Sequence, residues 1–170
     1  IVENRSWKEC GKPGRITTYD IRPEYAAFLR RFAKMDRKLK VVVDYANAMG
    51  LYEIGGITDL FDIVPLYDTL DGTFPNHEAN PLHLATLDAI RAKVVEAGAD
   101  FGAAFDGDAD RCLAVDEDGR VVNGDQIMYV CGCYMKEQGQ LQDNTIVTTV
   151  MSNFGLYKAF EREGISYEKT

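Results

Sequence analysis

The sequence predicts an α/β protein: a three-layer α/β/α domain with a mostly parallel sheet, followed by part of a second α/β domain. Short apolar runs typical of buried strands alternate along the chain with stretches whose apolar residues recur at helical spacing. Such alternation implies strand–helix–strand units, in which helices cover both faces of a sheet. The pattern completes one unit by Val122, and a second unit begins at Gly124. We therefore predict a linker over residues 1–20, an α/β/α domain over 21–122 and a partial, truncated α/β/α domain over 123–170.

The predicted strands are short and mostly apolar. They cover residues 39–44, 61–66, 101–105, 145–150 and 165–167, and a hairpin covers 112–122 with its turn at 116–119. The predicted helices begin at Pro23 and then cover 48–60, 82–98, 125–139 and 152–164. The Gly55-Gly56 pair weakens the second of these helices, because glycine disfavours a helix interior.

Local signals mark the buried side and the ends of these helices. Apolar residues at helical spacing predict the buried positions Tyr25, Phe28, Leu29 and Phe32 in the first helix, and Leu84, Leu87, Ile90 and Val94 in the third. Asp125 and Ser152 are the predicted N-caps. Gly98, Gly139 and Gly164 are the predicted C-terminal stops.

The composition favours a cytoplasmic protein that binds neither nucleic acid nor a membrane. The formal net charge is −8, which opposes binding to polyanions through the overall field. No apolar run approaches the roughly 20 residues that span a bilayer. The first residues do not form a signal peptide, and the missing initiator Met indicates a processed chain or a piece of a longer one. We expect the cysteines to be reduced and mostly buried: Cys10, Cys112, Cys131 and Cys133.

An acidic loop, residues 106–111, carries the clearest functional signal. Asp106, Asp108 and Asp110 alternate with Gly107 and Ala109 directly after a predicted strand. Three neighbouring carboxylates repel one another unless a cation lies among them. Oxygen clusters of this kind suit a hard cation such as Mg²⁺ or Ca²⁺. The next residue, Arg111, offers a planar guanidinium suited to phosphate.

Three other interpretations of the acidic loop stay open on the residues alone. The three aspartates and Glu117 fit positions 1, 3, 5 and 12 of an EF-hand, but Arg111 occupies the position that needs glycine. The Asp-x-Asp nucleophile of haloacid-dehalogenase-type phosphatases also follows a strand. A solvated acidic turn is the third interpretation, although it leaves the small spacers after a buried strand unexplained.

The segment 98–111, Gly-Ala-Asp-Phe-Gly-Ala-Ala-Phe-Asp-Gly-Asp-Ala-Asp-Arg, resembles the metal-loop signature of the α-D-phosphohexomutases, which include phosphoglucomutases, phosphomannomutases and phosphoglucosamine mutases. Residues 41–44 with Asn47, and the polar loop 71–81, also resemble the second domain of these enzymes. Residues 123–129 and 148–155 resemble phosphoglucosamine mutase more closely. The resemblance extends over nearly the whole chain.

The resemblance implies that Asp106, Asp108 and Asp110 bind Mg²⁺ and that Arg111 holds the phosphate of an enzyme phosphoserine. The complete enzyme would then interconvert hexose 1-phosphate and hexose 6-phosphate through a bisphosphate intermediate. The phosphoserine, the lysine acid/base and the distal phosphate loop of the family have no match in these 170 residues. We therefore expect this chain alone to be inactive. The alternative from another class is a non-enzymatic domain that binds a divalent metal.

Other polar residues at predicted strand ends receive structural interpretations. Asp44 and Asn47 follow a buried strand, and we expect them to stabilise a turn or cap a helix. His77 lies in a loop rich in Asn and Pro, where a structural role is more common than acid/base catalysis. We interpret Ser152-Asn153 as a helix cap.

Overall fold

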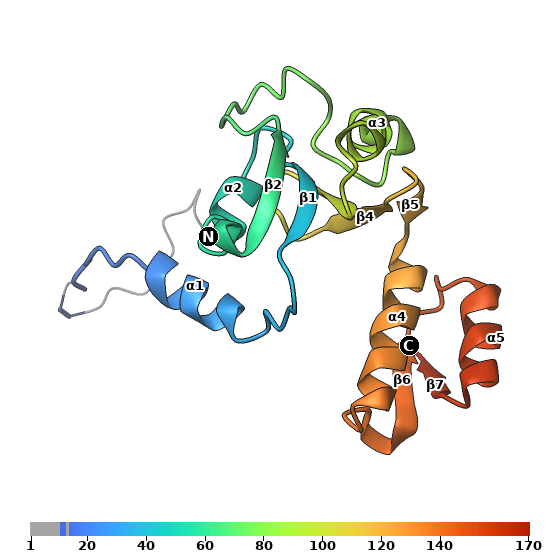
Figure 1. Ribbon diagram of the computed structural model, residues 1–170. Coiled ribbons are helices and arrows are strands. Elements are labelled where there is room, and N and C mark those ends of the chain that lie inside the picture. The colour runs from blue at the N-terminus through green and yellow to red at the C-terminus, as the bar shows by residue number, and fades with distance from the viewer. Residues whose placement is uncertain (1–10, 13) are drawn as a thin grey trace, which may run out of the picture.

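A five-stranded sheet in the order β2-β1-β3-β4-β5 organises the larger part of the protein (Figure 1). The structure is a computed structural model that describes residues 11–12 and 14–170. The strands are β1 (Leu39–Asp44), β2 (Phe61–Leu66), β3 (Phe101–Phe105), β4 (Cys112–Asp116) and β5 (Val121–Val122). β2, β1 and β3 run parallel, and β4 and β5 continue the sheet as an antiparallel hairpin. This mixed sheet confirms the predicted α/β class and the positions of its strands.

Helices cover both faces of this sheet. Helix α3 (Asp88–Ala97) packs on one face, where Ile90 and Val94 meet Val42 of β1. Gly102 of β3 permits this close approach, because a Cβ there would lie 2.8 Å from Val94 Cγ2. Helix α2 (Gly50–Glu53) covers the other face, and α1 (Arg22–Arg30) lies beyond it (Figure 1). The sheet is therefore the middle of three layers.

Several predicted helices differ from the observed ones. The crossover helix predicted for residues 48–60 is only α2 and a 3₁₀ turn, η1 (Thr58–Leu60), separated by the weak Gly55-Gly56 segment. The helix predicted from Leu82 begins with a 3₁₀ turn, η2 (Leu84–Leu87), so Leu84 is exposed while Leu87, Ile90 and Val94 are buried as predicted.

The apolar residues of α1 are not buried as predicted. No residue of α1 is fully buried, and Phe28 is 48% exposed. The helix instead docks through Ala26, which would contact a Cβ at Gly56, and through Arg30, which donates to the Gly56 carbonyl (2.8 Å). A hydrophobic stripe predicts a helix, but here small and charged residues make its contacts.

A second, two-stranded parallel sheet follows the first unit. Helix α4 (Gly124–Glu137) leads from the hairpin through η3 (Gln142–Asn144) to β6 (Thr145–Thr148). Helix α5 (Phe154–Glu163) then connects β6 to its parallel partner β7 (Ser166–Lys169). Phe160 of α5 is fully buried among Met128 and Ile146. Within the described residues, no helix has the length and apolar character needed to cross a membrane.

The predicted N-caps of α4 and α5 are wrong by one or two residues. Asn123, not Asp125, caps α4, and it forms a reciprocal capping box with Gln126. Asn153, not Ser152, caps α5 by accepting from the N–H of Gly155. In both cases an Asn at the first extended residue before the helix takes the cap. The left-handed glycines Gly98 and Gly164 end α3 and α5 as predicted.

Two further expectations meet different outcomes. Cys112 and Cys131 are exposed and Cys133 is partly buried, which corrects the expectation of mostly buried thiols. Cys10 and most of the predicted linker 1–20 lie outside the described residues. Its described part, residues 11–12 and 14–20, contains neither helix nor strand.

Candidate functional site

The carboxyl ends of β1 and β3 place buried acids at one edge of the sheet. These strands are parallel neighbours, with Asp44 opposite Ala104, so Asp44 and Asp106 leave the sheet on the same side. Both carboxylates are 1% exposed. Ligand sites of open α/β sheets form at this edge.

The acidic loop between β3 and β4 turns tightly around Asp106. The N–H of Ala109 donates to the Asp106 carbonyl (3.2 Å), and Ala109 has a left-handed φ of 60°. Carboxylate oxygens of Asp106, Asp108 and Asp110 come within 4.8 Å of one another. Asp106 is buried, whereas Asp108 and Asp110 are exposed. The three predicted residues therefore form one cluster with a single buried member.

Arg111 anchors this cluster through Asp106. Its backbone N–H donates to Asp106 Oδ1 (3.1 Å), and its Nε donates to Asp106 Oδ2 (2.6 Å). The Arg111 side chain is still 51% exposed. Each carboxylate oxygen has two lone pairs, so both oxygens of Asp106 keep a free acceptor position. The guanidinium is thus held at Nε while its outer part faces solvent.

The two ends of the acidic loop differ in protonation behaviour. Burial opposes ionisation of Asp106, but the backbone N–H and guanidinium of Arg111 outweigh it and hold the Asp106 pKa below its usual value. The charge of Asp108 raises the pKa of Asp110. This repulsion is the cost of gathering three carboxylates without a cation.

The donor set of the acidic loop fits a hard divalent cation. All its donors are carboxylate oxygens, the ligands of Mg²⁺ and Ca²⁺. Zinc sites, in contrast, are dominated by Cys and His ligands. Asp106, Asp108 and Asp110 could each contribute one oxygen, leaving further positions for water or a phosphate oxygen.

The polar loop 71–81 lies against the acidic loop. A Cβ at Gly107 would lie 3.7 Å from Ala79 and 3.8 Å from the ring of Phe74. Arg111 Nη1 approaches Asn80 Oδ1 at 3.5 Å. The sequence pattern does not single out Asn80 as a neighbour of Arg111, although the polarity of its loop is the signal that could have suggested it.

Asp44 and Asn47 stabilise a turn after β1, as predicted, and His77 contacts Asp44. Asp44 Oδ1 accepts from the N–H of Ala46 (2.9 Å), and Asp44 Oδ2 contacts His77 Nε2 (3.0 Å). Asn47 has a left-handed φ of 56°, and its side chain donates to Thr69 and accepts from Asn76. Sequence reasoning treated Asp44 and His77 separately and missed their contact across 33 residues.

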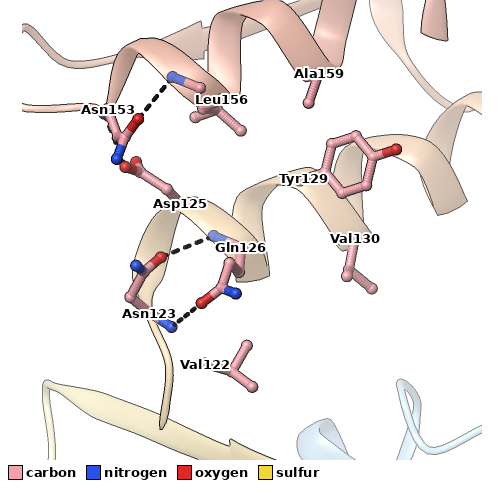
Figure 2. A pocket seen from close by; sticks show the side chains of 10 residues that line it. Val122, Asn123, Asp125, Gln126, Tyr129, Val130, Asn153, Leu156 and Ala159 are labelled. Atoms are coloured by element: carbon pink, nitrogen blue, oxygen red, sulfur yellow. Dashed lines mark hydrogen bonds between the residues drawn. The ribbon is translucent and has the colours of Figure 1, made fainter. Parts of the chain in front are cut away.

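A groove of about 530 Å³ lies between the N-terminal ends of α4 and α5 (Figure 2). The caps Asn123 and Asn153 accept from first-turn N–H groups of their helices. The carboxylate of Asp125 accepts from the backbone N–H of Asn153 (2.8 Å), which ties the two helices together. These side chains already serve the helix ends, so the groove's polar rim is explained by the fold.

The flanking strands argue against the EF-hand interpretation. An EF-hand loop joins two helices, whereas the acidic loop joins β3 to β4. Glu117 lies instead in the turn of the β4–β5 hairpin, where the Asp116 side chain accepts from the backbone N–H groups of Asp118 and Arg120.

Comparison with known families gives two adjacent matches. Residues 23–119 match the family model described as phosphoglucomutase/phosphomannomutase, alpha/beta/alpha domain II. Residues 123–170 match the model of alpha/beta/alpha domain III of the same family.

Curated proteins similar to this chain include several phosphoglucosamine mutases. The protein of Lachnoclostridium phytofermentans is 43% identical over 161 residues, which cover 92% of this chain and 35% of the relative. That of Carboxydothermus hydrogenoformans is 48% identical over 134 residues, 78% of this chain and 30% of the relative. The chain thus spans about a third of the length of these relatives.

Solved structures show the same fold. A phosphoglucomutase/phosphomannomutase family protein from Burkholderia thailandensis matches with a TM-score of 0.79 and 28% identity, over 89% of this chain and 33% of that chain. A putative phosphomannomutase from Thermus thermophilus matches with a TM-score of 0.68 and 20% identity, over 92% of this chain and 37% of that chain, which supports the fold alone.

Proposed function

The chain belongs to the phosphoglucomutase/phosphomannomutase family, the α-D-phosphohexomutases, and on this premise we propose that it is the metal-binding part of a phosphohexomutase. The complete enzyme would interconvert a hexose 1-phosphate and a hexose 6-phosphate in the cytoplasm. As the family resemblance implies, it would use an enzyme phosphoserine and a bisphosphate intermediate. Its domain boundary would fall after Val122.

The observation that carries this proposal is the acidic cluster with Arg111 at the carboxyl edge of β3. Asp106, Asp108 and Asp110 would hold Mg²⁺, which supplies positive charge to stabilise a transferring phosphoryl group. Asp106 orients Arg111 through two hydrogen bonds, and the exposed outer guanidinium would bind a phosphate oxygen. Arg111 is therefore the proposed catalytic residue of this part.

We further propose glucosamine phosphate as the substrate of the complete enzyme. The curated relatives at 43% and 48% identity are named phosphoglucosamine mutase. The two solved structures described above are named for phosphoglucomutase or phosphomannomutase, so the choice of glucosamine depends on the curated relatives alone.

Turnover by the complete enzyme tests both parts. The purified enzyme is assayed with the 6-phosphates of glucosamine, glucose and mannose, first after treatment with EDTA and then after Mg²⁺ is restored. We expect loss and recovery of activity, and the highest kcat/KM for glucosamine phosphate. Full activity without metal would contradict the role of the acidic cluster. A preference for glucose or mannose phosphate would contradict only the choice of sugar.

A further inference from the structure

The contact between Asp44 and His77 closes a hydrogen-bond chain across the sheet edge. His77 Nδ1 lies 2.8 Å from the carbonyl oxygen of Glu78, and His77 Nε2 lies 3.0 Å from Asp44 Oδ2. The Asp44 side chain is 1% exposed and that of His77 is 16% exposed. The pair is thus largely shielded from water, which could otherwise supply a missing donor.

Counting protons in this chain gives a definite result. A carbonyl oxygen can only accept, so Nδ1 of His77 must carry a hydrogen. In a neutral imidazole, Nε2 would then present a lone pair to the Asp44 carboxylate. A hydrogen bond at 3.0 Å requires one more proton, either on Nε2 or on Asp44 Oδ2. The two residues together must therefore hold one proton beyond an ionised carboxylate and a neutral imidazole.

Each residue of the pair also has a further contact. The other oxygen of Asp44 is held by the N–H of Ala46, and the ring of Tyr67 meets the His77 ring edge-on at 5.1 Å. Burial also raises the pKa of Asp44, against the opposing contributions of Ala46 and His77.

The segments that meet near the pair carry other ionisable groups. They are Tyr67 after β2, Glu78 with its partner His83 on and beyond the polar loop, and Asp106 with its partner Arg111 on the acidic loop. Besides burial, the pKa of Asp44 responds to Ala46 and His77 and to none of these other groups.

We propose that Asp44 and His77 share one bound proton at neutral pH and so form a clamp that positions the polar loop 71–81 against the acidic loop. His77 lies in the middle of the polar loop, between Phe74 and Ala79, which contact Gly107, and three residues before Asn80, which approaches Arg111. His77 acts on the acidic loop through these residues and is a positioning residue. The proposal concerns the folded chain and does not depend on the enzymatic activity.

Nuclear magnetic resonance of the 170-residue chain tests the shared proton. The chain contains two histidines, and His83, whose side chain is 63% exposed, is the internal control. Ring ¹⁵N signals of both histidines and the ¹³Cγ signal of Asp44 are recorded at about pH 7.5. We expect either protons on both ring nitrogens of His77, or a proton on Nδ1 of His77 and one on the Asp44 carboxyl. An ionised Asp44 with a neutral His77 at about pH 7.5 would overturn the proposal.

Asp44→Asn keeps the contact with His77 but removes the need for the extra proton. The asparagine side chain can still accept from Ala46 with its oxygen and can donate from its amide nitrogen to a neutral His77, so no extra proton is needed. We expect His77 to carry a hydrogen on Nδ1 alone at about pH 7.5 in this variant, while the amide signals of Gly107 and Ala109 stay in place. His77→Ala, which removes the contact, should instead shift these amides. His83→Gln, the matched control, should leave the His77 ring signals and both amides unchanged.

Two results would overturn the positioning role. The first is a folded His77→Ala variant in which the amides of Gly107 and Ala109 stay unmoved. The second is a shift of these amides in His83→Gln as large as the shift in His77→Ala. Should a variant fail to fold, the ring ¹⁵N and ¹³Cγ signals of the wild-type chain still decide whether the pair holds the extra proton.

Discussion

At the residue scale, the three carboxylates of the acidic loop differ in burial and therefore in role. Asp106 is buried and engaged by Arg111, whereas Asp108 and Asp110 are exposed and repel each other electrostatically. Asp106 therefore organises the loop, while Asp108 and Asp110 would be the accessible ligands of the proposed cation. Asp110 Oδ1 also lies 3.6 Å from Arg111 Nε. Replacement of Asp106 would disturb folding and function together, so Asp108 is the cleaner probe of metal binding.

Asp108→Asn in the complete enzyme should abolish most turnover with little effect on folding. Removing one exposed carboxylate relieves repulsion, so the free energy of unfolding should stay within about 0.5 kcal/mol of wild type or rise slightly. Loss of a metal ligand should lower kcat by about 100-fold or more. Thermal unfolding and steady-state kinetics measure the two effects. Asp36→Asn, an exposed substitution far along the chain, is the charge-matched control.

Unchanged kcat and Mg²⁺ dependence in the Asp108→Asn enzyme would show that the loop is a solvated acidic turn. A loss of activity shared equally by Asp36→Asn would instead indicate a general effect of net charge.

At the element scale, Asp100 fastens the start of β3 to the start of β1. Its carboxylate accepts from the Lys40 N–H (2.8 Å) and from the guanidinium of Arg37, and its own N–H donates to the Lys40 carbonyl. Arg37 first, and then the Lys40 N–H, lower the pKa of Asp100 to about 2. These hydrogen bonds join the parallel strands β1 and β3 at one end. The opposite ends of the same two strands lead to Asp44 and Asp106.

The stabilising effect of Asp100 should depend on acid pH. The folded-state pKa of about 2 lies below the unfolded value of about 3.9, so the contribution is complete above pH ~4. It is lost as pH falls from about 4 through about 2. Urea unfolding of wild type and Asp100→Asn between about pH 2 and about pH 6 should show a stability gap that closes in this window. A gap independent of pH would mean that the charge of Asp100 contributes nothing.

Close packing of α3 on β3 makes Gly102 sensitive to a single added carbon. A Cβ there would lie 2.8 Å from Val94 Cγ2 and 3.0 Å from Ile90 Cδ1. We expect Gly102→Ala to lower the free energy of unfolding by about 1–3 kcal/mol. Gly72→Ala, where a Cβ would meet no atom within 4 Å, should change it by less than about 0.5 kcal/mol. Equal effects of the two variants in urea unfolding would refute this explanation.

At the scale of the whole molecule, the chain carries the proposed metal site without the phosphoserine segment that the family resemblance implies for phosphoryl transfer. It spans about a third of the length of its curated relatives, and no Ser-His-Asn segment occurs in its sequence. The acidic loop offers three carboxylates, about half of the ligands that an octahedral Mg²⁺ site requires.

The isolated 170-residue chain should therefore bind Mg²⁺ weakly and convert no sugar phosphate. We expect a Kd weaker than about 10 µM, the weak end of the range of cytosolic calcium-sensor sites. Calorimetry with Mg²⁺, and an assay with glucosamine 1-phosphate, measure the two properties, with Asp108→Asn as the binding control. Sub-micromolar binding would favour a dedicated metal-binding domain, and measurable turnover would show that the missing groups are not required.

The sequence by itself determined the fold class, the order of the strands along the chain and the acidic cluster. Alternating apolar runs and stop residues are local properties, so β3 and its loop could be placed from residues 98–111 alone. The helix ends at Gly98 and Gly164 were predicted correctly for the same reason. A left-handed residue that ends a helix is a local feature, and glycine adopts this conformation readily. Three carboxylates at alternate positions likewise lie close together in any tight loop.

Only the tertiary structure decided which of these residues are buried and which meet across the sheet edge. The stripe on α1 predicted burial, but its surroundings leave Phe28 exposed, because burial depends on neighbouring elements rather than on periodicity. Asp44 and His77 are 33 residues apart and meet because β1 ends where the polar loop crosses the edge. Such contacts between distant segments are set by strand order and loop path, which local patterns do not specify.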